Sequence, residues 1–212
     1  MKIRWMSISC AFLFMLLAIM PTQSRAEMHT YYFNNNITGN TATLPLNQLS
    51  VQVEDVGDSQ VSLTFFNAVG TPSSIAQIYF YDGEYLSTPA SVADSGEGVE
   101  FKPVDLDPKN GLPGYGGGPL TVQFSADASD PVAPNGINVL GEWVMLTFGL
   151  KTTYANLLQG LDTGDLLIGL HVQAIGPLSK SDSYTTYVPV PGAVLLGFLG
   201  LGYAGMKLRK HV

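Results

Sequence analysis

Residue types that could carry catalysis or bind a metal are scarce and scattered in this sequence. Of the three histidines, only His29 and His171 lie in the central part of the chain, and no Gly-x-Ser-x-Gly turn is present to expose a nucleophilic serine. Zinc requires three or four His, Cys or carboxylate ligands, and the sequence supplies no persuasive set. We therefore expect no catalytic residue and no zinc site. The paired carboxylates of a glycosidase stay open, since any two of the 17 acidic residues could converge in a fold.

The acidic turns make calcium the best inorganic candidate. Asp105 and Asp107 are spaced like the first ligands of a calcium-binding loop. However, Lys109 stands where an EF-hand needs its next oxygen ligand, and Asn110 stands where it needs a glycine, so that motif fails. We expect no cofactor, with calcium as the one ion that an acidic domain leaves open.

Aromatic residues at solvent-facing strand positions suggest a different kind of site. Tyr79 and Tyr81 alternate with the apolar Ile78 and Phe80, so we predict that the two tyrosines share the polar face of one strand. Trp143 is predicted to face away from the buried side of its own strand. Aromatic rings stack on the apolar faces of sugars, and Tyr and Trp also bring polar groups. These three rings are a candidate sugar platform, and the alternative is that other segments cover them.

Short segments with a period of two must position these residues. Apolar and polar residues alternate between breaks rich in Gly, Pro, Asn and Asp, which is typical of strands and turns. One-sided strands in this number predict an all-β fold, an antiparallel β-sandwich of about nine strands. The segment Thr153–Leu161 indicates one helix, and the Pro/Gly-rich Lys102–Pro119 predicts a loop, either a binding loop or a mobile connection. The predicted strands are Tyr31–Phe33, Leu49–Asp55, Gln60–Phe66, Ile75–Tyr81, Val99–Phe101, Leu120–Phe124, Glu142–Leu150, Asp165–Ile175 and Tyr184–Val188.

Charge is distributed unevenly along the 212 residues. All 17 acidic residues lie between Glu27 and Asp182, whereas six of the ten basic residues lie in the two apolar ends. Residues 27–187 therefore carry four lysines against 17 acids, a formal charge of −13. Such an acidic body repels phosphate backbones, so we expect no nucleic-acid partner. We predict that 27–187 forms one acidic domain.

The first 26 residues have the three parts of a secretion signal. Lys2 and Arg4 precede the uncharged, mostly apolar run Met6–Met20, and small residues precede a cleavage point between Ala26 and Glu27. The run is shorter than the roughly 20 residues that span a bilayer, which favours a cleaved signal over an uncleaved anchor. Cleavage there would also remove Cys10, the only cysteine, and leave a domain without disulfides.

The last 25 residues, 188–212, form a second segment of opposite polarity. Val188-Pro189-Val190-Pro191-Gly192 leads into the Gly-rich apolar run Ala193–Met206, and Lys207, Arg209 and Lys210 follow. The run predicts a short single membrane helix. The basic residues favour the cytoplasmic side, which places the acidic domain outside the cell.

At these residues the tail resembles the PEP-CTERM family of bacterial sorting tails. Val188, Pro189 and Pro191 match the family's Val-Pro-Glu-Pro-like signature, whereas Val190 occupies the position of the glutamate. The resemblance implies export, recognition of the tail by an exosortase-like membrane protease, and a setting in bacteria that secrete exopolysaccharide. The alternative is a plain single-span anchor without processing.

These observations predict a non-enzymatic protein of the cell surface or extracellular matrix. The expected path runs through the export machinery to the inner membrane, where the C-terminal helix holds the chain until it is processed. A role in exopolysaccharide or biofilm organisation follows from the family resemblance alone. A secreted carbohydrate-binding module is the second interpretation, with polysaccharide as its partner, and a secreted hydrolase is the third.

Overall fold

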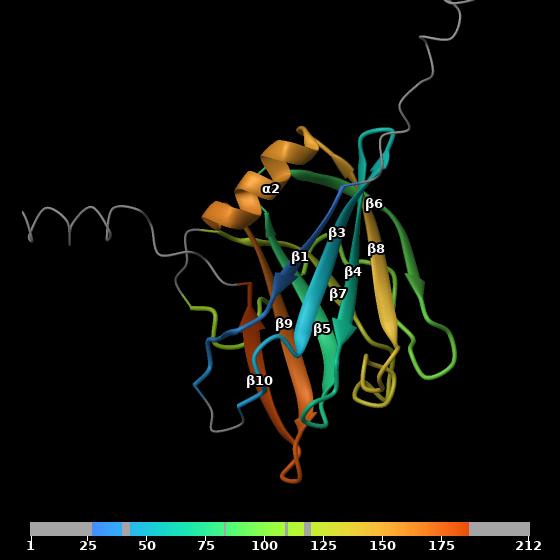
Figure 1. The fold of residues 1–212 in the computed structure, drawn as a ribbon, viewed down its shortest axis with the longest axis vertical. Coiled ribbons are helices and arrows are strands. Elements are labelled where there is room, and N and C mark those ends of the chain that lie inside the picture. The colour runs from blue at the N-terminus through green and yellow to red at the C-terminus, as the bar shows by residue number, and fades with distance from the viewer. Residues whose placement is uncertain (1–26, 40–42, 83, 109, 117–119, 187–212) are drawn as a thin grey trace, which may run out of the picture.

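Two antiparallel sheets of five strands each form the body of the protein, in a computed structural model that describes residues 27–39, 43–82, 84–108, 110–116 and 120–186 (Figure 1). The first sheet has the order β1-β3-β4-β8-β6, and the second has the order β2-β10-β9-β5-β7. The elements are β1 (Met28–Tyr32), β2 (Asn35–Asn36), β3 (Leu49–Gly57), β4 (Gln60–Asn67), β5 (Ser74–Asp82), β6 (Leu86–Asp94), β7 (Val122–Asp127), β8 (Trp143–Leu150), α2 (Tyr154–Thr163), β9 (Leu166–Ile175) and β10 (Lys180–Thr185).

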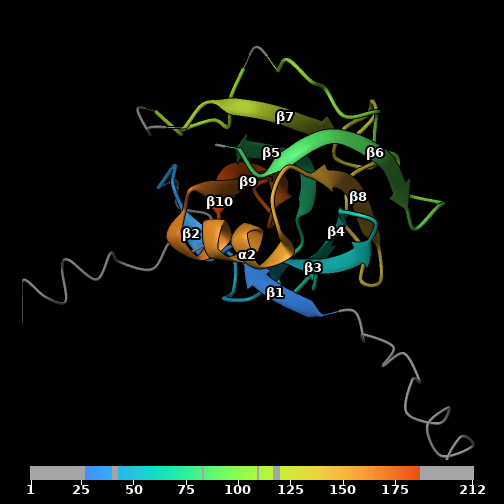
Figure 2. The same cartoon turned by 90° about the horizontal axis from the view of Figure 1, so that it is seen from above.

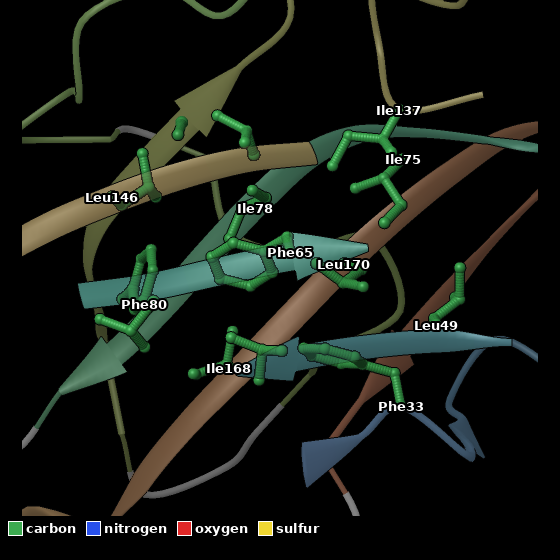
Figure 3. Close-up of a cluster of buried hydrophobic side chains, with 14 of the residues drawn as sticks. Phe33, Leu49, Phe65, Ile75, Ile78, Phe80, Ile137, Leu146, Ile168 and Leu170 are labelled. Carbon is green, nitrogen blue, oxygen red and sulfur yellow. The ribbon is translucent and has the colours of Figure 1, made fainter. Parts of the chain in front are cut away.

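The main core lies between the two sheets, which face each other when the molecule is seen from above (Figure 2). Alternate apolar residues of β3, β4 and β8 point into this core, while the residues between them are mostly half-buried on the outer side. This pattern confirms the predicted one-sided strands. Rings from the two sheets meet directly: Phe80 of β5 contacts Phe65 of β4 edge-on, with 6.2 Å between the ring centroids (Figure 3). The Phe80 ring centroid also lies 5.0 Å from that of Phe148 of β8.

The second sheet is covered on both of its faces. Every residue of β5 except Gln77 is buried, and so are the first five residues of β9. A second, smaller core on the outer side explains this burial. It consists of Tyr79, Tyr81, Leu112 and Leu167, with Ile37, Tyr115, Leu120 and Val122 packed against it.

The predicted helix is confirmed as α2, which lies across one end of the two sheets (Figure 1). The side chain of Thr153 accepts a hydrogen bond from the N–H of Asn156 and so caps the first turn. Gly164 ends the helix at φ 82°, a left-handed conformation that glycine adopts without strain. Leu157 and Leu161 point into the main core and close that end of it.

Three details of the strand prediction are wrong. The prediction missed β2 and β6, and the predicted strand Val99–Phe101 forms only an isolated bridge, at Phe101; the described residues contain ten strands where about nine were predicted. β6 contains Pro89 and small side chains, which weaken any strand signal. β6 is an edge strand, and its pairing with β8 shifts register on both sides of Pro89. Proline and register shifts are features that protect an edge from pairing with another chain.

Candidate functional site: a polar pocket beside the helix

A polar pocket of about 430 Å³ opens at the end of the sheets where α2 lies. Two parts of the chain that are distant in sequence meet there: the turn from β5 to β6, and the stretch that runs from the end of β8 through α2 to the start of β9. Its volume falls within the range of small-molecule sites. We call it the α2 pocket, and its lining residues are Glu84, Tyr85, Lys151, Thr152, Asn156, Gln159 and Asp165.

Tyr85 is held in the pocket wall by contacts on three sides. The buried carboxylate of Asp82 accepts hydrogen bonds from the N–H of Tyr85 at 2.8 Å and from the N–H of Leu86 at 2.9 Å. The carbonyl of Tyr85 accepts the N–H of Lys151 at 2.9 Å. A Cβ atom on Gly160 would lie 2.6–3.0 Å from three carbons of the Tyr85 ring, so the ring rests directly on the helix backbone. Only glycine leaves that space.

The start of α2 fixes a second part of the wall. The Asn156 side chain donates to the Thr152 hydroxyl at 2.9 Å, and Gln159 lies nearly one helical turn further along. On the opposite link, the Thr163 hydroxyl donates to the carboxylate of Asp165 at 2.8 Å. Neighbouring side chains therefore hold the Asn156 amide and the Asp165 carboxylate in place.

The charges of the pocket are mixed. Glu84 and Asp165 are acidic and exposed, and Lys151 is the one basic residue in the wall. Burial raises the pKa of the Tyr85 phenol, and the carboxylates of Asp165 and Asp82 raise it further. The phenol therefore stays protonated at neutral pH and keeps an O–H that can donate.

This arrangement is suited to holding a ligand by hydrogen bonds. The wall combines donors (the ammonium, amides, hydroxyl and phenol) with acceptors (two carboxylates and the amide oxygens). Across the described residues, no group of three or more His, Cys, Asp or Glu side chains is placed to hold a metal ion.

The predicted sugar platform is wrong. Tyr79 and Tyr81 do share one face of β5, but only 5% and 3% of their surfaces are exposed. The segment carrying Leu112 and Tyr115 covers them: the Leu112 N–H donates to the Tyr81 hydroxyl at 2.7 Å, and the Tyr115 ring lies 4.3 Å from the Tyr81 ring. The part of the predicted 102–119 loop around Leu112 and Tyr115 thus packs over the second sheet.

Trp143 does not join these tyrosines either. It is half-buried at the start of β8 in the first sheet, where it pairs with Phe66, while the neighbouring Val144 points into the core. Tyr79 lies on the outer face of the second sheet. The whole core separates the two rings, so no ligand can stack on both.

A second hollow of about 400 Å³ runs along the edge strand β6. Thr88 to Val92 form one side, and Phe101, Pro103, Val104 and Leu106 form the other. Its side chains are mostly apolar or small, so it offers few groups that could orient a polar ligand. The α2 pocket is the better candidate for specific binding.

His171 and the acidic turns, which the sequence singled out, have structural partners. His171 Nδ1 lies 2.9 Å from Gln77 Oε1, so this nitrogen carries the proton and donates. Burial lowers the pKa of His171, and the nearby Asp182 partly offsets that effect. Asp105, from the predicted calcium loop, accepts the N–H of Asp107 at 3.0 Å in a local turn.

The predicted signal cleavage point at Ala26, the sorting signature at 188–192 and the basic stop at Lys207, Arg209 and Lys210 lie outside the described residues, except for Glu27. Among the helices of the described part, none is long and apolar enough to cross a membrane.

Comparisons of this chain with protein-family models, with curated proteins and with solved structures found no match. Its function must therefore be inferred from its own residues and geometry.

The sequence reasoning missed every residue of the α2 pocket. Glu84 and Lys151 follow predicted strands and Asp165 begins one, and each is next to a Gly or Thr residue that signals a turn. That local signal marks three turns but does not say that they share one end of the fold. The order of the strands in the two sheets brings them together.

Proposed function

We propose that this chain is an exported, non-enzymatic protein of the cell surface or extracellular matrix, sorted by its C-terminal tail. The observation that carries the proposal is the distribution of charge. Every acidic residue lies between Glu27 and Asp182, whereas Lys2 and Arg4 precede the first apolar run and Lys207, Arg209 and Lys210 follow the last one. A signal peptide over 1–26 and a membrane helix within 188–212 would place the acidic domain outside the cell from both ends.

The tail gives the proposal its specific form. The signature Val188–Gly192 would be read at the outer membrane face by an exosortase-like protease, because Pro189 and Pro191 keep their own backbone and that of the preceding residues extended. Lys207, Arg209 and Lys210 would hold the end of the chain in the cytoplasm until the cut. The resemblance to PEP-CTERM tails supports this path and its exopolysaccharide setting.

The contacts of the buried acids support a non-enzymatic role. Asp82 is fully engaged with two backbone N–H groups. Asp182, 1% exposed, accepts hydrogen bonds from Asn36 Nδ2 at 3.1 Å and from the Thr38 hydroxyl. Both carboxylates thus fasten segments of the fold.

Cell fractionation tests the proposal. In a bacterium that carries an exosortase-type protease, the full chain should reach the cell exterior, whereas the double variant Pro189→Ala/Pro191→Ala should accumulate in the inner membrane. The matched control Pro72→Ala/Pro177→Ala changes two exposed prolines within the domain and should be sorted normally. Equal sorting of all three proteins would contradict the proposal.

Carbohydrate binding is the second candidate function. The overturned tyrosine–tryptophan platform does not support it, but the α2 pocket does, because it combines one aromatic ring with several planar polar side chains. Sorting and sugar binding are compatible in one protein.

A further inference from the structure

We infer that the α2 pocket binds a hexose unit of an electrically neutral polysaccharide. This inference names the ligand of the second candidate function and rests on it, and it does not depend on how the tail is processed. The described residues that line the pocket come from the turn between β5 and β6 and from the stretch 151–165.

The mixture of donors and acceptors selects a polyhydroxylated ligand. Lys151, Asn156 and Gln159 supply N–H donors, and Glu84 and Asp165 supply acceptors within the same cavity. A hydroxyl group both donates and accepts, so a sugar ring can pair with both kinds of wall. A bare cation would use only the acceptors of the wall, and a phosphate would use only the donors.

Charge selects a neutral sugar over an acidic one. Two carboxylates face one ammonium in the pocket, and residues 27–187 as a whole carry a formal charge of −13. A uronate or sulfated chain would bring further negative charges against this field. A neutral hexose avoids that repulsion and can still accept from Lys151.

Part of the wall is organised before the ligand arrives. Asp82 and the Gly160 backbone fix Tyr85, and the hydrogen bond to Thr152 fixes the plane of the Asn156 amide. Groups that are already in place lose little conformational entropy on binding, so a few hydrogen bonds suffice for measurable affinity.

Calorimetric titration of the full chain tests the inference, in a zwitterionic detergent whose head group contains no sugar. The probes are neutral hexaoses built from glucose, mannose, galactose or N-acetylglucosamine, with hexameric alginate as the anionic comparison. At least one neutral hexaose should bind with a Kd of about 1 mM or below, and more tightly than alginate.

The decisive variant is Asn156→Ala/Gln159→Ala. Alanine favours the helical state, so α2 should persist, and the loss of two amides should raise the Kd about ten-fold or more. The control Asn110→Ala/Gln123→Ala removes one amide of each kind from exposed positions outside the pocket and should leave the Kd unchanged.

Three results would overturn the inference: no heat with any neutral hexaose at about 10 mM, tighter binding of alginate, or full binding by the pocket variant. None of them bears on whether the tail is cut. Conversely, failed sorting of a chain that still binds sugar would count only against the proposed path of export.

Discussion

At the scale of single residues, Gly136 occupies one of the tightest places in the fold. The neighbouring Ile137 exchanges two backbone hydrogen bonds of 3.1 Å with Ile75, which draws this loop against β5. A Cβ atom on Gly136 would lie 2.3 Å from the Ile75 carbonyl oxygen, and the backbone cannot move away without breaking that pair.

We therefore predict that Gly136→Ala lowers the free energy of unfolding by about 2 kcal/mol, measured by urea denaturation. Gly116→Ala is the matched control, because nothing lies within 4 Å of its Cβ position and its φ is not left-handed. Similar unfolding free energies of the two variants would contradict the prediction, because they would show that the loop at Ile137 moves at little cost to accommodate the added methyl group.

A half-buried hydrogen-bonded row crosses three strands of the second sheet at His171. Gln77 of β5 bonds His171 of β9 on one side and the carboxylate of Asp127 of β7 on the other. Burial lowers the pKa of His171 despite the opposing charge of Asp182 on β10, and it raises the pKa of Asp127. Burial therefore favours the neutral forms of His171 and Asp127, although Gln77 and Lys102 oppose this effect on the pKa of Asp127.

This row predicts a pH dependence of stability. Because the folded-state pKa of His171 lies below its ordinary 6.5, the unfolded chain binds a proton that the folded chain lacks just below that pH. The His171 contribution is thus complete above about pH 6.5 and is lost as the pH falls through this window. His171→Gln keeps a donor to Gln77 but does not titrate, so denaturant titrations at several pH values should show the wild type losing more stability than the variant on acidification. If the unfolding free energies of the wild type and the variant fell equally on acidification, the role given to His171 would be contradicted.

At the scale of elements, the success of the sequence pattern depended on what lies outside each strand. The period of two in β3, β4 and β8 correctly predicted their buried sides, because their other face is partly open to solvent. In β5 the same pattern misplaced Tyr79 and Tyr81, since a segment some thirty residues later in the chain packs over them. Nothing in the sequence of β5 itself indicates that a later segment packs over its outer face. The α2 pocket escaped prediction for the same reason: it depends on which strands pair, and turn residues do not encode that.

The cover over β5 can be tested through one hydroxyl group. Tyr81→Phe leaves the ring in place but removes the acceptor of the buried Leu112 N–H, which should cost about 1–2 kcal/mol of unfolding free energy. Limited proteolysis should also cut faster within 110–116, because the cover opens more often. Tyr32→Phe, at a tyrosine that is 41% exposed, should change neither quantity. A cover as resistant in Tyr81→Phe as in the wild type would mean that apolar packing alone holds it.

At the scale of the whole molecule, stability should come from the two cores rather than from covalent links. The only cysteine lies within the first 26 residues, so residues 27–187 expressed alone should unfold at the same temperature with and without a reducing agent. Their far-UV circular dichroism should be dominated by β structure, with α2 as a minor component. A spectrum with more than about one third helix would contradict the fold.

The intact mass of protein recovered from the cell exterior tests the central claim most directly, in a host with an exosortase-type protease. The proposal predicts a chain that begins at Glu27 and lacks the residues after Pro191, because both apolar ends serve only transport. A chain that begins at Glu27 and still ends at Val212 would show that the tail is an anchor and not a sorting signal, and would contradict the proposal.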